Sequence, residues 1–196
     1  MAQQKYHVKN PVVAFLVRRF FCRIAEVLAS VEPQSVLDAG CGEGELLRRG
    51  VLSGCRTVSL DRSQEALAEI RNGSPRGLSD NTVCGSVLAL PFAGGAFDAV
   101  VCLEVLEHLE NPASAVRELM RVARKAVVLS VPHEPYFRIG NLLRGKYLDR
   151  WGNHPEHIQH WNRRRFRDFL VPAGSEVRVV EAFPWIVACC RPKGKA

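Results

Sequence analysis

The spacing of hydrophobic and polar residues changes along the chain from a helical period to that of buried strands. Residues 11–31 carry apolar side chains at helical spacing with arginines mostly between them, which predicts an amphipathic helix. After Pro33 the apolar residues form short continuous runs, which are typical of strands covered on both faces. The first five of these runs lie at residues 35–39, 57–60, 82–84, 96–102 and 125–131.

Helices are predicted between most of these strands. Alternation of strand and helix predicts a parallel sheet covered on both faces, with right-handed crossover connections. Two further strand-like runs, at 176–182 and 185–190, are joined by the short Phe183-Pro184 link, which predicts an antiparallel pair at one side of the sheet. The segments with helical spacing lie at about residues 44–52, 63–72 and 112–123.

The segment after the fifth strand has a different composition. Residues 132–165 are rich in His, Pro, Gly, Arg and aromatic residues and, up to Trp161, show no sustained periodicity. Ligands of open α/β sheets bind outside the carboxyl ends of the strands. We therefore expect this segment to be a substrate lid, inserted in a single domain of residues 1–196 whose first 33 residues form a cap helix.

Composition and cysteine usage indicate the class of protein and the cellular compartment in which it is expected. With 47% hydrophobic and 24% charged residues, the 196-residue chain has the composition of one soluble globular domain. Its seven cysteines are odd in number and form no CxxC pair, which favours free thiols in a reducing compartment over disulfides or zinc. Arg18, Arg19 and Arg23 interrupt the first apolar stretch, so neither a signal peptide nor a membrane span is expected. The expected location is the cytoplasm.

The chain carries a formal net charge of +7, concentrated in arginine-rich pieces. Such charge can attract nucleic acid, anionic lipid or acidic substrates. Aromatic residues are not interleaved with the arginines as they are in a stacking platform for bases. A solubilising surface is therefore favoured, and nucleic acid is a possible but not favoured partner.

The strongest motif is a glycine-rich turn between the first strand and the following helix, in the sequence VLDAGCGEG at residues 36–44. Gly40 and Gly42 allow a sharp turn and close approach of a ligand, and Gly44 allows close packing of the helix. Asp61 ends the next strand about 20 residues later, where a carboxylate can accept hydrogen bonds from ribose hydroxyls. Together these features predict an adenosine site.

Asp38 discriminates between adenosine-containing cofactors. A dinucleotide fingerprint usually reads GxGxxG and directs the helix dipole at a pyrophosphate. Asp38 precedes the glycines and would repel that pyrophosphate. The turn therefore favours a cationic adenosyl cofactor over NAD.

With Asp61, the DAGCGEG turn resembles the class I S-adenosylmethionine-dependent methyltransferases of type 11, the group that includes ubiquinone and menaquinone biosynthesis enzymes. LALPF at 88–92, GAFDAVV at 95–101 and EVLEHL at 104–109 are similar to the LPF, FDxV and EHL series of that group. The resemblance spans about residues 35–131. It implies S-adenosylmethionine as cofactor and a Rossmann-like, mostly parallel sheet of seven strands in the order 3-2-1-4-5-7-6.

The resemblance also implies roles for matched residues. Asp38 and the neighbouring amides would hold the amino acid portion of the cofactor, and Asp61 the ribose. Gly85-Ser86-Val87 stands where the family often has an acidic residue, so we expect somewhat looser adenine binding. The implied cofactor-binding residues are Asp38, Gly40, Cys41, Gly42, Asp61, Arg62, Ser86, Val87, Leu103 and His108.

Transfer of a methyl group from a sulfonium mainly requires positioning of the acceptor and exclusion of water, with a general base only for reluctant nucleophiles. His133 directly follows the fifth strand, and His157 belongs to an HxxHxxH array with His154 and His160. These two are the candidate catalytic residues. No metal is expected, because Pro155 breaks helical regularity and no cysteine or paired carboxylate completes a ligand set.

The reaction expected is methylation of an O, N or C atom of a small-molecule acceptor. RNA or protein methylation is the runner-up, although no NPPY-like tetrapeptide follows the fourth strand. A non-catalytic cofactor-binding module is a further alternative. The N-terminal helix could also touch a membrane through Val12, Phe15, Leu16 and Phe20, but a cap over the active site is favoured. Acceptor, general base and oligomeric state stay open.

Overall fold

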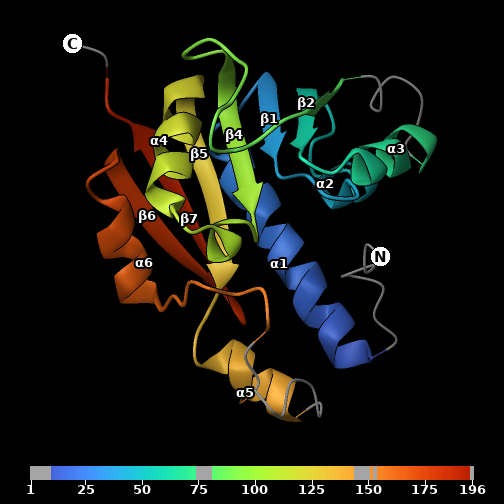
Figure 1. Ribbon diagram of the computed structural model, residues 1–196, viewed down its shortest axis with the longest axis vertical. Helices are drawn as coiled ribbons and strands as arrows, with labels where there is room; N and C mark the ends of the chain where they lie inside the picture. The colour runs from blue at the N-terminus through green and yellow to red at the C-terminus, as the bar shows by residue number, and fades with distance from the viewer. Residues whose placement is uncertain (1–9, 74–80, 144–150, 152–153, 195–196) are drawn as a thin grey trace.

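A computed structural model describes residues 10–73, 81–143, 151 and 154–194. The strands form one seven-stranded sheet in the order β3-β2-β1-β4-β5-β7-β6 (Figure 1). This confirms the predicted fold class and strand order. The strands are β1 Ser35–Ala39, β2 Arg56–Asp61, β3 Thr82–Cys84, β4 Phe97–Leu103, β5 Ala123–Pro132, β6 Gly174–Ala182 and β7 Trp185–Pro192.

The first five strands pair in parallel, and β7 runs antiparallel between β5 and β6. Pro132 at the end of β5 pairs with Trp185 at the start of β7, so the β6–β7 hairpin lies at the carboxyl end of β5. The helices are α1 Pro11–Ala29, α2 Glu45–Arg48, α3 Gln64–Gly73, α4 Pro112–Val122, α5 Tyr136–Leu143 and α6 Arg163–Leu170, with a short 3-10 turn, η1, at Leu106–His108.

Two apolar cores cover opposite faces of the sheet. Successive side chains of a strand point to opposite faces, and in β1 Val36 packs with helices α1 to α3 whereas Leu37 packs with α4 and α6. Every position of β1 is buried. Burial on both faces explains why the parallel strands were visible as continuous apolar runs.

Helix α1 begins and ends close to the prediction. The Asn10 side chain accepts a hydrogen bond from the Val12 amide at 2.9 Å, which caps the helix before its first-turn Pro11. Phe20, which the sequence pattern groups with possible membrane-facing residues, is fully buried, with its ring centroid 4.8 Å from that of Trp185. The suggestion that Phe20 faces a membrane is therefore wrong.

Three short helices differ from the expectation. Helix α2 has only four residues where nine were expected. Helix α5 lies inside the segment expected to be irregular, and α6 was not predicted. In α6 only Phe166 and Leu170 are buried among arginines, so one turn of apolar spacing is too short to give a clear helical pattern.

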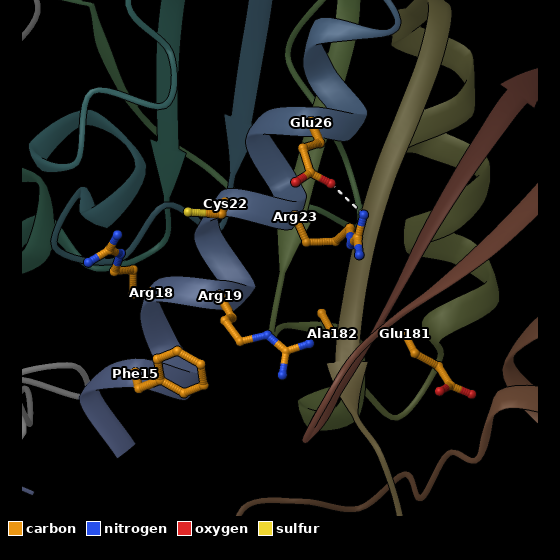
Figure 2. Close-up of a pocket in the computed structure, with 8 residues that line it drawn as sticks. All are labelled: Phe15, Arg18, Arg19, Cys22, Arg23, Glu26, Glu181 and Ala182. Atoms are coloured by element: carbon orange, nitrogen blue, oxygen red, sulfur yellow. Dashed lines mark hydrogen bonds and ion pairs between the residues drawn. The ribbon is translucent and has the colours of Figure 1, made fainter. Parts of the chain in front are cut away.

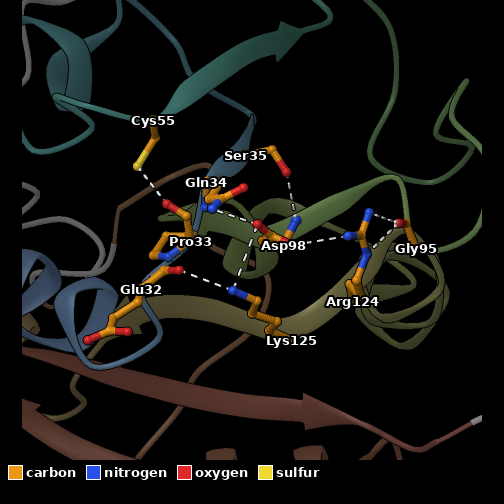
Figure 3. Close-up of polar contacts among 9 residues, drawn as sticks. All are labelled: Glu32, Pro33, Gln34, Ser35, Cys55, Gly95, Asp98, Arg124 and Lys125. Carbon is orange, nitrogen blue, oxygen red and sulfur yellow. Dashed lines mark hydrogen bonds and ion pairs between the residues drawn. The ribbon is translucent and has the colours of Figure 1, made fainter.

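The amino-terminal ends of β1, β4 and β5 are joined by a polar cluster around Asp98 (Figure 3). The Asp98 carboxylate accepts a hydrogen bond from the Gln34 amide at 2.9 Å and lies 3.4 Å from the Arg124 guanidinium. The Asp98 amide donates to the Ser35 hydroxyl at 3.0 Å, and Lys125 donates to the Glu32 carbonyl. The aspartate of the FDxV motif thus stabilises the fold at the end of the sheet away from the glycine turn.

Within the described part of the chain, no helix has the length and apolar content needed to cross a membrane.

Candidate functional site

A cavity of about 640 Å³ lies at the carboxyl ends of β1, β2 and β4. Parallel strands end at the same edge of a sheet, so residues following different strands meet there. The cavity is lined by all ten residues implied as cofactor-binding, namely Asp38, Gly40, Cys41, Gly42, Asp61, Arg62, Ser86, Val87, Leu103 and His108. The candidate catalytic residues His133 and His157 are not in its lining.

The glycine turn requires glycine for two different reasons. At Gly40, with φ of +77°, a Cβ atom would lie 2.5 Å from Val105 Cγ2, so close packing against the segment after β4 excludes a side chain. At Gly42, also at positive φ, a Cβ would meet nothing within 4 Å. Gly42 therefore presents bare backbone toward open space, as a closely approaching ligand requires.

The amides of the turn are already used inside the protein. Gly40 and Cys41 both donate to the Leu60 carbonyl, at 2.7 and 3.0 Å, and Gly42 donates to Asp61 Oδ2 at 2.9 Å. The sequence suggested these amides as donors to the cofactor. In this arrangement Gly40 and Cys41 instead contribute the shape of the turn, by fixing it to β2.

The two acids of the cavity have different surroundings. Asp38 is 3% exposed, and burial, followed by the nearby charge of Asp61, raises the pKa of its carboxyl to about 7. Asp61 accepts hydrogen bonds from the Gly42 and Ser63 amides. A cationic ligand would favour the ionised form of Asp38, so this end of the cavity suits an ammonium or sulfonium group.

Near the third strand, the loop that replaces the usual acidic residue is fixed by local contacts. The Gly85 amide donates to the Asp61 carbonyl at 3.0 Å, and the Ser86 hydroxyl accepts from the Leu88 amide at 3.2 Å. The Ser86 hydroxyl hydrogen can still be donated to a ligand. The following LPF segment is attached to α4, because the Leu90 amide donates to Glu118 and the Leu90 carbonyl accepts from Arg121.

Glu104 is a buried cavity residue that sequence reasoning missed. Its carboxylate accepts hydrogen bonds from Ser130 at 3.1 Å and from the Trp185 indole at 2.8 Å. Its backbone has a φ of 56°, which is rare for a residue with a side chain and recurs at active sites and ligand clamps. The signal in the sequence was the first glutamate of EVLEHL, which was used only as part of a motif.

The histidine-rich segment closes over η1. The Ile158 and Gln159 amides donate to the Glu107 carbonyl at 2.9 and 3.1 Å, and the Gln159 side chain donates to the Leu109 carbonyl. His108 Nδ1 lies 2.9 Å from the Glu156 carbonyl oxygen. These contacts place residues 156–159 at the edge of the cavity.

The two candidate catalytic histidines lie in different places. His157 is buried behind His108, with 5.0 Å between their ring centroids. His133 follows β5 and packs on Tyr136, and burial lowers the pKa of its imidazole. The structure therefore brings His157, and not His133, next to a residue that lines the cavity.

Glu107 adds a carboxylate to the histidines. In the described part of the chain, ligand atoms of Glu107, His108 and His157 lie within 4.8 Å of one another, and such a set could hold a metal ion. The sequence expectation of no metal rested on the lack of a cysteine or paired carboxylate near the histidines. The structure adds one carboxylate from a different segment, Glu107, beside His108 and His157, while His154 and His160 of the HxxHxxH array are not part of this set.

Comparison with known proteins gives the following matches. Residues 37–131 match the model of a family described as "Methyltransferase domain". The chain is 31% identical over 157 residues to a 2-phytyl-1,4-naphtoquinone methyltransferase of Synechococcus elongatus, with 74% of this chain and 66% of the relative covered. It is 35% identical over 94 residues to a ubiquinone biosynthesis O-methyltransferase of Chromobacterium violaceum, with 45% and 39% covered. The chain thus spans less than two thirds of the length of these relatives.

Solved structures share the fold. Magnesium protoporphyrin IX methyltransferase from Synechocystis, with bound SAH, superposes with a TM-score of 0.69 at 17% identity over 95% of this chain and 89% of that one. The methyltransferase domain of bacterial CtHen1 superposes with a TM-score of 0.66 at 24% identity, over 90% of this chain and 99% of that one.

Proposed function

Because the chain belongs to the class I S-adenosylmethionine-dependent methyltransferases, we propose that it transfers a methyl group to an O, N or C atom of a small-molecule acceptor. The single observation that supports this most strongly is that all ten implied cofactor residues line one cavity. Its volume of about 640 Å³ is ordinary for a cofactor site.

The residues present fit S-adenosylmethionine, which supplies an activated methyl group when bound. Asp38 would hold the ammonium, and Asp61 the ribose hydroxyls. Arg62, Ser86 and Val87 would surround the adenine. The methionine end would lie beside Leu103 and His108, the side of the cavity that residues 156–159 close.

We propose that residues 132–165 form the acceptor lid and that α1 caps the site, all within one domain. The contacts of the lid segment with η1 support the first assignment, and Phe21 of α1, which lines the cavity, supports the second. The names of the relatives support a quinone-type acceptor. A cytoplasmic location is consistent with the seven cysteines, all of which are free thiols.

For an acceptor hydroxyl, His108 of η1 and His157 of the lid provide a route for the proton. His108 lies in the cavity wall, and His157 packs against it from the buried side. His157 could take the proton of the acceptor or orient the group that does. His133 is the alternative base, and it is the weaker candidate because it does not line the cavity and its ring packs on Tyr136, whereas that of His157 packs on His108.

The direct test is ligand-induced thermal stabilisation. S-adenosylmethionine and its demethylated product should raise the melting temperature at micromolar concentrations, and NAD should not. Absence of a shift with both adenosyl ligands would contradict the proposal.

A further inference from the structure

Exposed apolar side chains gather at the end of the molecule where the parallel strands finish. Val12 and Phe15, in the first turns of α1, are 64% and 59% exposed. Tyr136 and Ile139 on α5 are each 47% exposed, as is Phe183 at the tip of the β6–β7 hairpin. The start of α1 and helix α5 both lie at the lower end of the molecule in Figure 1, below the arrowheads of β4 and β5. We call these five residues the apolar face.

The apolar face draws its residues from three neighbouring elements. The ring centroids of Tyr136 and Phe183 are 5.5 Å apart, and Ile139 lies one helical turn beyond Tyr136. Phe15 lines the same hollow as Ala182, which precedes Phe183. Apolar patches shared between elements are uncommon on surfaces that contact only water, and they mark docking sites for proteins or membranes.

Arginines lie beside the apolar face. The hollow, of about 320 Å³, is lined by Arg18, Arg19 and Arg23 of α1 (Figure 2). Arg23 pairs with Glu26, whereas Arg18 and Arg19 form no ion pair with any other residue in the part of the chain that the structure describes. The Arg19 guanidinium lies 5.8 Å from the centre of the Phe15 ring. Arg18 and Arg19 thus adjoin exposed apolar groups without an ion pair in the described residues, and three arginines face two glutamates, Glu26 and Glu181, around the hollow.

A third observation comes from the lid. Trp151 is 73% exposed, and its carbonyl accepts a hydrogen bond from Arg138 of α5 at 3.3 Å. Tryptophan, tyrosine and arginine together are typical of surfaces at the boundary between water and lipid headgroups.

We propose that the apolar face, with Arg18 and Arg19, docks the protein on an anionic lipid bilayer. The apolar side chains would enter the boundary between headgroups and acyl chains, and the guanidinium groups would bind lipid phosphates. Charge complementarity selects this occupant over a neutral apolar partner, because a purely apolar partner would leave the two arginines without anions.

Docking in this orientation gives the cofactor cavity access to the membrane. Helix α1 carries Phe15 on its exposed side and Phe21 in the cavity lining. A lipid-like acceptor could then pass from the bilayer to the site along α1. This consequence rests on the proposed methyl transfer, but docking itself does not.

The test is co-sedimentation of the full chain with phosphatidylcholine vesicles, with and without phosphatidylglycerol. We expect binding only to the anionic vesicles and weakening with salt. Phe15→Glu should lower the partition coefficient about tenfold, since one inserted aromatic side chain is removed. The double change Arg18→Glu and Arg19→Glu should lower it at least as much.

Matched controls lie on and after α6. Val171→Glu introduces the same charge at another exposed apolar residue, and Arg164→Glu with Arg165→Glu reverses two adjacent exposed arginines. Both controls should bind nearly as wild type. Equal losses in test and control variants would show an effect of net charge alone and would overturn the proposal, as would absence of anionic-vesicle binding.

A dimer in solution that Phe15→Glu dissociates, without vesicle binding, would assign the face to a second copy of the chain and would also overturn the proposal. The vesicle assay contains neither cofactor nor acceptor. Thermal stabilisation by S-adenosylmethionine, measured on the same samples, therefore distinguishes failure of docking from failure of the proposed function.

Discussion

Asp38 and Asp61 lie at the ends of neighbouring strands, yet their carboxylates have different surroundings. Asp38 is buried and its carboxyl has a pKa of about 7. A cationic ligand beside it would therefore shift the carboxyl toward its ionised form. Asp61 bridges the Gly42 and Ser63 amides and so joins the glycine turn to the start of α3. Both residues were found from the sequence, but their surroundings were not.

Replacing Asp61 tests its double role. Asp61→Ala should abolish thermal stabilisation by S-adenosylmethionine and lower the free energy of unfolding by about 1–3 kcal/mol, because two amides lose their acceptor. Ligand titration and urea unfolding measure the two effects. Asp168→Ala, at an exposed position of α6, is the control and should change neither. An unchanged affinity for the cofactor would remove Asp61 from the site.

The raised pKa of Asp38 predicts a pH dependence. A carboxyl whose pKa is higher in the folded than in the unfolded protein binds its proton more tightly when folded, so its contribution to the stability of the cofactor-free protein decreases from about pH 4 to pH 7. Cofactor affinity should increase over the upper part of this range as Asp38 ionises. Asp38→Asn should remove the pH dependence of stability, measured by urea unfolding across pH, and that of cofactor affinity, measured by calorimetric titration. Persistence of either dependence in the variant would assign it to another group.

Elements far apart in the chain meet at the lid. Residues 156–159 are held on η1 through the carbonyls of Glu107 and Leu109. Because these bonds use backbone carbonyls in η1 and directly after it, nothing in the histidine spacing itself indicated where the array would lie. The same contact explains how Glu107 comes to face His157.

Substitution of His157 tests the lid. His157→Asn should lower kcat about 10²-fold or more with little change in cofactor affinity, whereas His133→Asn should change kcat much less. Steady-state rates with a quinone-type acceptor and cofactor titration measure this. The same assays with EDTA, followed by addition of a divalent ion, separate proton transfer at His157 from metal binding by Glu107, His108 and His157. A larger effect at His133 would reverse the assignment.

At the scale of the whole molecule, the two ends of the sheet carry different groups, and we propose that they have separate functions. The carboxyl ends of the strands hold the cavity, the proposed lid and the apolar face. The opposite end is stabilised by the Asp98 cluster, where the Gln34 amide and the neighbouring cations Lys125 and Arg124 hold the pKa of the Asp98 carboxyl below its usual value. Stability and ligand binding are therefore expected to respond to different substitutions.

Asp98→Asn should lower the free energy of unfolding by about 1–3 kcal/mol and leave cofactor affinity unchanged. The lowered pKa means that the stabilisation by Asp98 is present above the usual carboxyl pKa and is lost as pH falls through the folded value. The variant should therefore lose less stability than wild type on acidification, as measured by urea unfolding across pH. A cofactor affinity that falls with stability would contradict the separation of the two ends.

The sequence by itself determined the sheet, its strand order through the family resemblance, and the ten cavity residues, because apolar runs and a glycine turn are local signals with strong backbone consequences. The tertiary structure alone decided which histidine approaches the cavity and that Glu107 lies beside His157. It also decided that Phe20 is buried while Phe15 is exposed. The physical reason is contact between distant segments: η1 receives the lid through backbone carbonyls, and Trp185 of β7 covers one side of α1. Local spacing carries no record of such contacts.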